Sequence, residues 1–345
     1  MRPLSAPPGG FRRIAVLRLS SLGDIVLTLP VVHALKKAFP EAQISYWVKE
    51  EFVDLVRLDP TIAHVRVLER DARRLEDLLS MSAELEDADL IVDLHGNLRT
   101  RVLTFRQKSP VLRTPSFRLA RSARVHVRWA GWPAPPTVLA RHGLALAPLG
   151  VRLEQVPRVE AGTQAEAWAG EWVGNWHPLG PPVALVPGAA HATKRWPEAH
   201  WLELHDRLRA AGHSVLYFGL QADRDRVPQL AAKVALDGGA RWCMERLPRV
   251  AALLSHCPVA VAGDTGLMHL AAARGARVVA LFGSTAPELG FAPAGTGHAV
   301  LCRHEPCQPC TLHGRKGCPK GHFKCMIELR PAAVETEVQR LIAQA

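Results

Sequence analysis

The sequence predicts an α/β protein built from two consecutive domains, each a parallel sheet with helices on both faces. The chain has 345 residues, which is more than one ordinary hydrophobic core accommodates. Short apolar runs alternate with amphipathic segments, which is the pattern of strands and helices around a parallel sheet. The alternation stops in a stretch rich in proline and then resumes. These three observations indicate two similar domains joined by a linker.

The first domain is expected to place four strands and two helices before the linker. The apolar runs that predict its strands lie at residues 13–19, 44–48, 64–68 and 90–94. The segments with apolar side chains at a helical spacing lie at residues 23–39 and 71–86. Prolines then crowd residues 131–182, where we place the linker. We expect this domain to span residues 12–165.

The second domain is expected to repeat the alternation over residues 180–345. Its predicted strands lie at residues 183–186, 214–218, 259–262 and 277–282. Its predicted helices lie at residues 197–211, 222–234, 266–274 and 332–344. Ligands of such sheets bind at the carboxyl ends of the strands, so we expect the site in the cleft between the two domains.

The composition is that of a globular protein with a strong positive charge. Hydrophobic residues make up 48% and charged residues 22%. No apolar run reaches 18 residues and the first residues lack an apolar secretory core, so we expect a cytoplasmic protein. The net charge of +11 favours an anionic partner, which is a nucleic acid, a membrane surface or an acidic substrate. Between Asp93 and Glu154 there are eleven cations and no carboxylate, so the charge is local.

The turn after the first predicted strand carries a carboxylate, in the sequence Ser20-Ser21-Leu22-Gly23-Asp24. Gly23 permits a tight turn, and Asp24 falls in the first turn of the next helix at the carboxyl edge of the sheet. One interpretation is a carboxylate that complements the helix dipole. The other is a general base at the mouth of a cleft.

Two further turns in the second half suit a phosphate group. Residues 187–197 end a strand, continue through small residues and supply Lys194 and Arg195 before Pro197 begins a helix. The Walker spacing is absent, and the alternative is an ordinary solvated loop. Residues 263–273 form a second strand–turn–helix, whose capping and glycine residues leave backbone N–H groups open to an anion.

These three segments together resemble the bacterial heptosyltransferases, ADP-heptose:lipopolysaccharide glycosyltransferases of glycosyltransferase family 9. The motifs are LRLSSLGDIVLTLP, PGA…TKRWP and GDTGLMHLAAA, and the resemblance runs from about residue 13 to about residue 340. It implies the GT-B architecture, in which two Rossmann-like domains face each other across a cleft. The first domain then binds the acceptor, and the second binds most of the nucleotide sugar.

The resemblance also implies roles for single residues. Asp24 stands where the family has its proposed catalytic base. Two alanines, Ala189 and Ala190, replace hydroxyl residues of well-known members, and Thr193 is a candidate substitute. The residues expected at the donor are Lys194, Thr193, Asp223, Asp264, Thr265, Gly266 and His269.

The implied reaction is an inverting transfer of a heptose from ADP-heptose onto the lipopolysaccharide inner core. It needs no metal or other cofactor, because protein cations neutralise the diphosphate. The acceptor is anionic and anchored in a membrane, so we expect an enzyme peripheral to the inner membrane and no nucleic-acid partner. The cations expected at the acceptor are Arg99, Arg101, Arg118, Arg121, Arg124 and Arg128.

Four cysteines near the C-terminus have a spacing typical of metal sites. They are Cys307, Cys310, Cys318 and Cys325, in the pattern C-x2-C-x7-C-x6-C. A structural zinc outside the chemistry is one interpretation. The others are reduced thiols in a loop and adventitious disulfides.

Three other functions are compatible with parts of the sequence. A nucleic-acid-binding protein would explain the charge, but the basic stretch has few aromatic residues and no recognised motif. A nucleotide-sugar epimerase shares the architecture and would act on the donor alone. A nicotinamide dehydrogenase is disfavoured, because the first strand leads into SSLGD and not into G-x-G-x-x-G.

Overall fold

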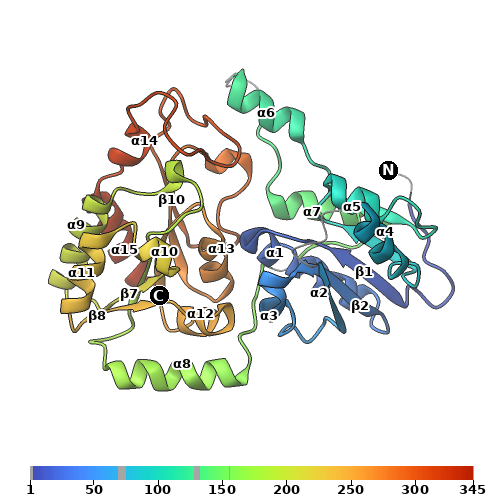
Figure 1. Ribbon diagram of the computed structural model, residues 1–345, viewed down its shortest axis with the longest axis horizontal. Coiled ribbons are helices and arrows are strands. Elements are labelled where there is room, and N and C mark those ends of the chain that lie inside the picture. The colour runs from blue at the N-terminus through green and yellow to red at the C-terminus, as the bar shows by residue number, and fades with distance from the viewer. Residues whose placement is uncertain (1–2, 69–74, 128–132, 155, 345) are drawn as a thin grey trace. The chain divides into compact units, whose positions relative to one another are not determined.

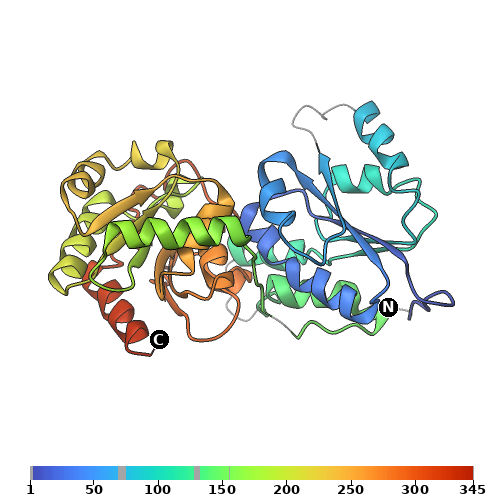
Figure 2. The ribbon, with the colours of Figure 1, turned by 90° about the horizontal axis from the view of Figure 1, so that it is seen from below.

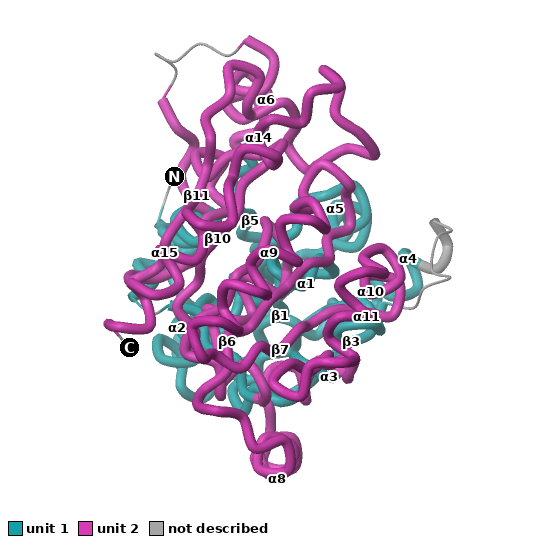
Figure 3. The backbone as a smooth tube through the Cα atoms, turned by 90° about the vertical axis from the view of Figure 1, so that its left-hand side faces the viewer, with its two compact units in different colours: residues 1–116, 138–160 teal, residues 117–137, 161–345 magenta. Residues whose placement is uncertain are grey.

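The computed structural model describes residues 3–68, 75–127, 133–154 and 156–344 and divides into two compact units. Unit 1 contains residues 1–116 and 138–160, and unit 2 contains residues 117–137 and 161–345 (Figure 3). This division differs from the expected domain boundary of 165, because residues 117–137 group with the second unit. No helix in the described part of the chain is long and apolar enough to cross a membrane.

Unit 1 is built on a sheet of five parallel strands in the order β3-β2-β1-β4-β5. The strands are β1 (Arg13–Leu17), β2 (Gln43–Lys49), β3 (His64–Leu68), β4 (Leu90–Asp93) and β5 (Val111–Arg113). At the carboxyl end of β1, Leu17 pairs with Trp47 of β2 and with Asp93 of β4. The central strand β1 is therefore flanked by a neighbour on each side.

The helices of unit 1 are short, and all but the last belong to the connections between consecutive strands of its sheet (Figure 1). They are α1 (Leu22–Val26), α2 (Leu29–Ala38), α3 (Val53–Val56), α4 (Leu75–Ala83), α5 (Leu98–Leu103) and α7 (Val138–Leu146), with 3-10 turns η1 (Glu50–Phe52) and η2 (Ala147–Leu149). The predicted single helix 23–39 is broken between α1 and α2. The reason is Pro30, which has no N–H to donate and whose ring would clash with the backbone carbonyl four residues earlier in a continuous helix.

Unit 2 is built on a sheet of six parallel strands in the order β11-β10-β9-β6-β7-β8. The strands are β6 (Val183–Val186), β7 (Val215–Phe218), β8 (Ala240–Cys243), β9 (Val259–Gly263), β10 (Arg277–Phe282) and β11 (Ala299–Cys302). The parallel sheets predicted from the alternating pattern are confirmed in both units. The predicted strands 183–186 and 277–282 match β6 and β10 in both bounds.

The helices of unit 2, apart from the first, lie around this sheet (Figure 1). They are α6 (Arg118–His126), α8 (Thr163–Trp176), α9 (Glu198–Ala210), α10 (Gln221–Arg224), α11 (Pro228–Leu236), α12 (Leu247–Leu254), α13 (Gly266–Ala273), α14 (Lys324–Ile327) and α15 (Pro331–Ile342), with 3-10 turns η3 (Ala192–Lys194) and η4 (Pro287–Leu289). Proline again divides a predicted helix. Pro228 lies inside the expected 222–234 segment and begins α11, so α10 and α11 take the place of one continuous helix.

Residues 131–182, within which we place the linker, are helical over much of their described length. They contain α7 and the 14-residue helix α8, shown in green in Figure 2. Buried residues of α8 are few, so the apolar periodicity that signals a helix is weak there. Aromatic and cationic contacts hold it instead, since the guanidinium of Arg249 on α12 lies 4.4 Å from the ring centre of Trp168.

Candidate active site

Each sheet reverses its strand order at one point, and Asp24, Lys194 and Asp264 follow strands that lie at these two points. In unit 1 the reversal lies between β1 and β4, and in unit 2 it lies between β6 and β9. Open parallel sheets bind ligands at the carboxyl ends of such strands, where the loops diverge and leave room. The two positions are described separately below.

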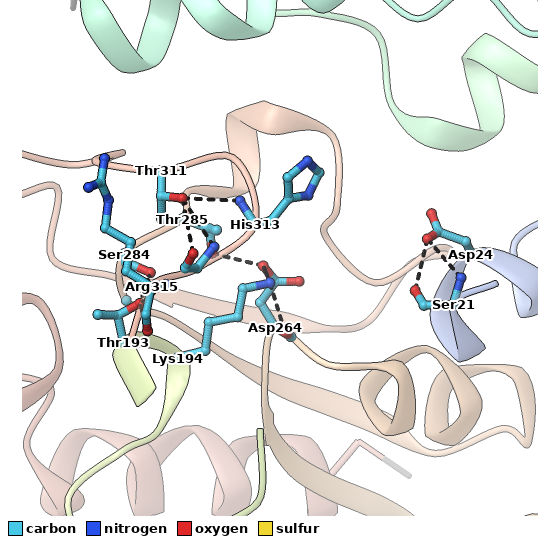
Figure 4. A network of polar contacts seen from close by, with 12 residues as sticks. Ser21, Asp24, Thr193, Lys194, Asp264, Ser284, Thr285, Thr311, His313 and Arg315 are labelled. Atoms are coloured by element: carbon cyan, nitrogen blue, oxygen red, sulfur yellow. Dashed lines mark hydrogen bonds and ion pairs between the residues drawn. The ribbon is translucent and has the colours of Figure 1, made fainter. Parts of the chain in front are cut away.

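Asp24 lies in the first turn of α1, directly after β1, where one of its oxygens is fully engaged. Oδ2 is 2.7 Å from the guanidinium of Arg18, and accepts hydrogen bonds from the hydroxyl (2.9 Å) and the N–H (3.3 Å) of Ser21 (Figure 4). Among the residues that the structure describes, none donates a hydrogen bond to Oδ1. One carboxylate oxygen is therefore fixed and the other is open to a ligand.

Arg18 is fixed as firmly as the carboxylate that it holds. Its Nε donates to the carbonyl of Ser20 (2.8 Å), and its NH1 donates to the carbonyl of Leu94, just beyond β4 (2.6 Å). Burial on its own would raise the pKa of Asp24. The charge of Arg18 and the hydrogen bonds from Ser21 and Arg18 outweigh it and lower that pKa to about 2. Asp24 is thus a carboxylate at any physiological pH.

Two histidines of unit 1 face the same pair of charges, and sequence analysis missed them together with Arg18. Burial, with the charge of Arg18, lowers the pKa of His95 to about 4 and that of His142 to about 3. Both rings are therefore neutral near pH 7. His95 follows β4, and a search of the residues after the neighbouring strand would have found it. His142 comes from α7, inside the predicted linker.

Lys194 and Asp264 form the corresponding pair in unit 2, at the ends of β6 and β9. The Lys194 ammonium lies 2.7 Å from Oδ2 of Asp264 and donates to the backbone carbonyl of the same residue (3.2 Å). The hydroxyl of Thr285, beyond β10, donates to Oδ2 as well (2.8 Å; Figure 4). An ammonium has three N–H donors, and no third acceptor bonds to it among the described residues. One donor therefore stays available for a ligand.

Two glycines let the sheet approach the Lys194 turn closely. A Cβ on Gly263 would lie 2.9 Å from the carbonyl oxygen of Lys194, and one on Gly283 would lie 2.7 Å from that of Thr193. Both separations are too short for real atoms. The close packing of η3 against the ends of β9 and β10 thus requires glycine at these positions.

The N-terminus of α13 has the features expected of an anion site. Thr265 is the N-cap, and its buried hydroxyl oxygen has no hydrogen-bond partner among the described residues. Gly266 begins the helix, whose first N–H groups have no partner within the helix. His269 is buried one turn further on. The structure therefore places Asp264, Thr265 and Gly266 together at one edge of unit 2.

Asp223 and Thr193 are held by neighbouring protein groups. Asp223, after β7, accepts the N–H of Leu220 (3.0 Å) and pairs with Arg226 (2.8 Å), and its carboxylate fills the space that a Cβ on Gly188 would need. Thr193 is 1% exposed, and its hydroxyl points into the protein. It therefore presents no polar atom to a donor that arrives from solvent.

The cations expected at the acceptor do not form one group within one unit. Arg99 and Arg101 lie on α5 of unit 1, whereas Arg118, Arg121 and Arg124 lie on α6, which groups with unit 2. The last two are half-buried. Arg128 lies outside the described residues.

The four clustered cysteines line one small cavity of unit 2. The cavity has a volume of about 10 Å³, and His322 also lines it. Sγ of Cys307 lies 3.7 Å from Nε2 of His322, and no disulfide joins the cysteines. Burial, with the neighbouring thiols, raises the pKa of Cys325 to about 12. No three potential ligands in the described part of the chain are arranged to hold a metal as they stand.

Comparison with known proteins assigns this arrangement to a family. The model of glycosyltransferase family 9 (heptosyltransferase) matches residues 79–320. Lipopolysaccharide heptosyltransferase 1 of Pseudomonas aeruginosa is 30% identical, over 96% of this chain and 98% of its own length.

Solved structures confirm the fold. A glycosyl transferase family 9 protein from Veillonella parvula has a TM-score of 0.80 at 20% identity and covers 97% of this chain and 98% of its own. ADP-heptose lps heptosyltransferase II of E. coli has a TM-score of 0.73 at 19% identity and covers 96% and 99%. The predicted α/β class with two Rossmann-like units is therefore confirmed, as is the family that the three motifs predicted. This chain belongs to glycosyltransferase family 9, the heptosyltransferase family.

Proposed function

We propose that this protein is an inverting heptosyltransferase that moves a heptose from ADP-heptose onto the lipopolysaccharide inner core. The observation that carries the proposal is Asp24, a carboxylate with one oxygen fixed by Arg18 and the other open, at the carboxyl end of β1. Its support is the full-length similarity to a lipopolysaccharide heptosyltransferase 1. An epimerase of the same architecture is not favoured by these comparisons.

Asp24 acts as the general base in this proposal. An acceptor hydroxyl donates its hydrogen bond to Oδ1, and its oxygen attacks the anomeric carbon of the donor. The bond from that carbon to the diphosphate breaks with inversion, and the hydroxyl proton passes to Oδ1. With a pKa of about 2, Asp24 is a weak base toward a free hydroxyl. It takes the proton late, when the forming glycosidic bond has made the hydroxyl acidic.

Lys194 and the N-terminus of α13 stabilise the leaving ADP. Lys194 keeps one N–H donor beyond the two that Asp264 accepts, and a diphosphate oxygen suits it as a partner. The N–H groups that follow Thr265 at the start of α13 add fixed donors. These groups are in place before the charge develops, which is the condition for strong electrostatic stabilisation. We assign them the role that a metal ion plays in other transferases.

The acceptor and the membrane meet a basic and partly apolar surface in this proposal. On unit 1, Leu98 and Phe105 are 78% and 82% exposed beside Arg99 and Arg101. Apolar side chains among cations suit the interface of an anionic membrane. We therefore place the enzyme at the cytoplasmic face of the inner membrane, with lipopolysaccharide and not nucleic acid as its partner.

A donor and acceptor screen read by mass spectrometry tests the function. ADP-heptose, UDP-sugars and GDP-sugars are each supplied with and without a lipopolysaccharide core acceptor. We expect a product only with ADP-heptose and acceptor, with its mass raised by one heptose. Conversion of a donor without acceptor would indicate an epimerase. A transfer product with UDP- or GDP-sugars, and none with ADP-heptose, would refute the assigned donor.

We also propose that the cysteine cluster holds a structural zinc ion. Thiolate and imidazole are ligands that zinc prefers, and four cysteines with His322 line one cavity of suitable size. Since no three of them are arranged to hold a metal as they stand, their side chains must rearrange on binding. Elemental analysis of purified protein is expected to give about one zinc per chain, and Cys318→Ser to lower both zinc content and Tm. Metal-free protein with an unchanged Tm would refute this.

A further inference from the structure

The segment that carries the cysteines, residues 302–325, is bonded directly to the turn that carries Lys194. The N–H of Arg315 donates to the hydroxyl of Thr193 (2.8 Å), and the N–H of Thr193 donates to the carbonyl of Arg315 (3.2 Å). These residues are 122 positions apart in the sequence. Gly314 lies against His191, where any side chain would overlap the imidazole. We call residues 302–325 the cysteine segment.

The same segment is bonded to the loop that follows β10. The N–H of Cys310 donates to the carbonyl of Ser284 (2.9 Å). The side-chain amide of Gln308 donates to the carbonyls of Phe282 and Thr285 (3.1 Å each). The cysteine segment therefore fixes two loops, which are themselves joined by a hydrogen bond of 2.7 Å between the hydroxyls of Thr193 and Ser284.

Both of these loops lead to Lys194. Thr193 precedes it in η3 and sets the position of its backbone. Thr285 donates to Oδ2 of Asp264, and this oxygen holds the ammonium of Lys194. Figure 4 shows polar contacts that join Arg315, Thr193 and Ser284, and others that join Thr285, the next residue in the chain, to Asp264 and Lys194. The ammonium is thus held through its backbone and its side chain by groups that the cysteine segment fixes.

We propose that Thr193 is a positioning residue, which couples the cysteine segment to the diphosphate contact of Lys194. The inference rests on the proposed role of Lys194 in donor binding. Thr193 touches no substrate, because its hydroxyl is buried and used by Ser284 and Arg315. The cysteine segment then supports the donor site, instead of being a structural element outside the chemistry, as the spacing of its cysteines suggested.

Replacement of Thr193 by valine tests the proposal, because valine keeps the branched shape and removes the hydroxyl. We expect Thr193→Val to weaken ADP binding, measured by calorimetry, about tenfold, because the loss of position should cost about as much as the weakest charged hydrogen bond between Lys194 and a phosphate. The donor KM should rise alike and the acceptor KM should stay. Thr193→Ser should restore ADP affinity to within about twofold of the original.

Ser214→Ala is the matched control. Ser214 is equally buried in unit 2, and its hydroxyl accepts the N–H of Leu179 (2.9 Å). It precedes β7 and so lies at the amino ends of the strands, whereas the Lys194 turn follows the carboxyl end of β6. We expect both variants to lower Tm, and only Thr193→Val to weaken ADP binding. If both lower Tm and leave ADP affinity unchanged, or if serine fails to rescue, the positioning role is refuted. Should the valine variant not fold, Ser284→Ala removes one bond of the same hydroxyl and should weaken ADP binding by a smaller factor.

A double variant separates this inference from the proposed function. If Thr193 acts through Lys194, Thr193→Val should add nothing to the loss caused by Lys194→Ala. Additive losses would refute the coupling. Should Lys194→Ala leave ADP affinity unchanged, the donor assignment itself fails, whatever Thr193 does.

Discussion

The two units carry the same kind of ion pair at the same place in their sheets, with the roles of acid and base exchanged. Arg18 and Asp24 are 2.7 Å apart at the reversal point of the first sheet, as are Lys194 and Asp264 at that of the second. In unit 1 the acid is the more exposed partner, with 23% against 13%. In unit 2 the base is the more exposed, with 14% against 8%. The more exposed partner is the one that we assign to the substrate.

The buried partner of each pair suits its task of holding the other. Arg18 has a planar fork of donors that bonds two backbone carbonyls and still reaches Asp24, and its charge does not titrate near neutral pH. Asp264 accepts from Lys194 and Thr285 with a single oxygen, which leaves the flexible ammonium a donor to spare. One fold thus produces a fixed carboxylate in one unit and a fixed cation in the other.

The largest effect is expected from removing the acid that we assign to the acceptor. Asp24→Asn keeps the shape and loses the proton acceptor, so kcat should fall by roughly 10²–10⁴. ADP affinity should not change, because Asp24 belongs to unit 1 and the residues that we propose for the donor belong to unit 2. Steady-state kinetics and calorimetry measure the two quantities. A turnover close to that of the original protein would refute the base assignment.

Removing the cation that we assign to the donor should have the next largest effect. Lys194→Ala deletes a contact of about 1.5–3 kcal/mol with the diphosphate, and so should weaken ADP binding roughly tenfold to a hundredfold. The acceptor KM should stay nearly unchanged. Lys194→Arg is the control that keeps the charge. If Lys194→Ala leaves ADP affinity intact while raising the acceptor KM, the assignment of Lys194 to the donor is wrong.

Removing Arg18, the buried partner of Asp24, should change the pH dependence of kcat/KM more than it changes the rate at neutral pH. Because the pKa of Asp24 is lowered, its ion pair contributes stability above pH 3.8, and this is lost as pH falls through about 2. In Arg18→Met, burial remains and raises that pKa, so the acidic limb of kcat/KM should move to higher pH. At pH 7 we expect a loss of about tenfold from poorer orientation. Arg18→Lys should keep the limb low, and an unshifted limb in the methionine variant would contradict the role of Arg18.

Much of this comparison was accessible from the sequence, because strand–turn–helix junctions place their polar residues at one edge of a parallel sheet. Asp24, Lys194 and Asp264 were found in this way. Arg18 was not, because its anchor on Leu94 depends on β4 lying beside β1, which the order of residues does not reveal. The buried direction of the Thr193 hydroxyl was hidden as well, since its partner lies 122 residues away.

The smallest effects are expected from the surface arginines, which extend the comparison to the acceptor. Arg99 and Arg101 belong to unit 1, which also contains Asp24. Arg118 is exposed on α6 and belongs to unit 2, which also contains Lys194. An exposed cation contributes little through a single contact, so each alanine variant should raise the acceptor KM about two- to fivefold. The rise in acceptor KM should be largest at low ionic strength. Above about 0.15 M, salt screens the charges of the original protein as well, so removing one of them changes less.

If these arginines all bind the anionic acceptor, each should affect the acceptor KM, whichever unit contains it. Arg118→Ala should therefore resemble the double variant Arg99→Ala/Arg101→Ala in raising acceptor KM, and both should leave ADP affinity within about twofold of the original. Acceptor kinetics at two salt concentrations, with ADP calorimetry, decide the matter. If Arg118→Ala weakens ADP binding and spares the acceptor KM, then α6 serves the donor together with the rest of unit 2, and the acceptor cations are confined to unit 1.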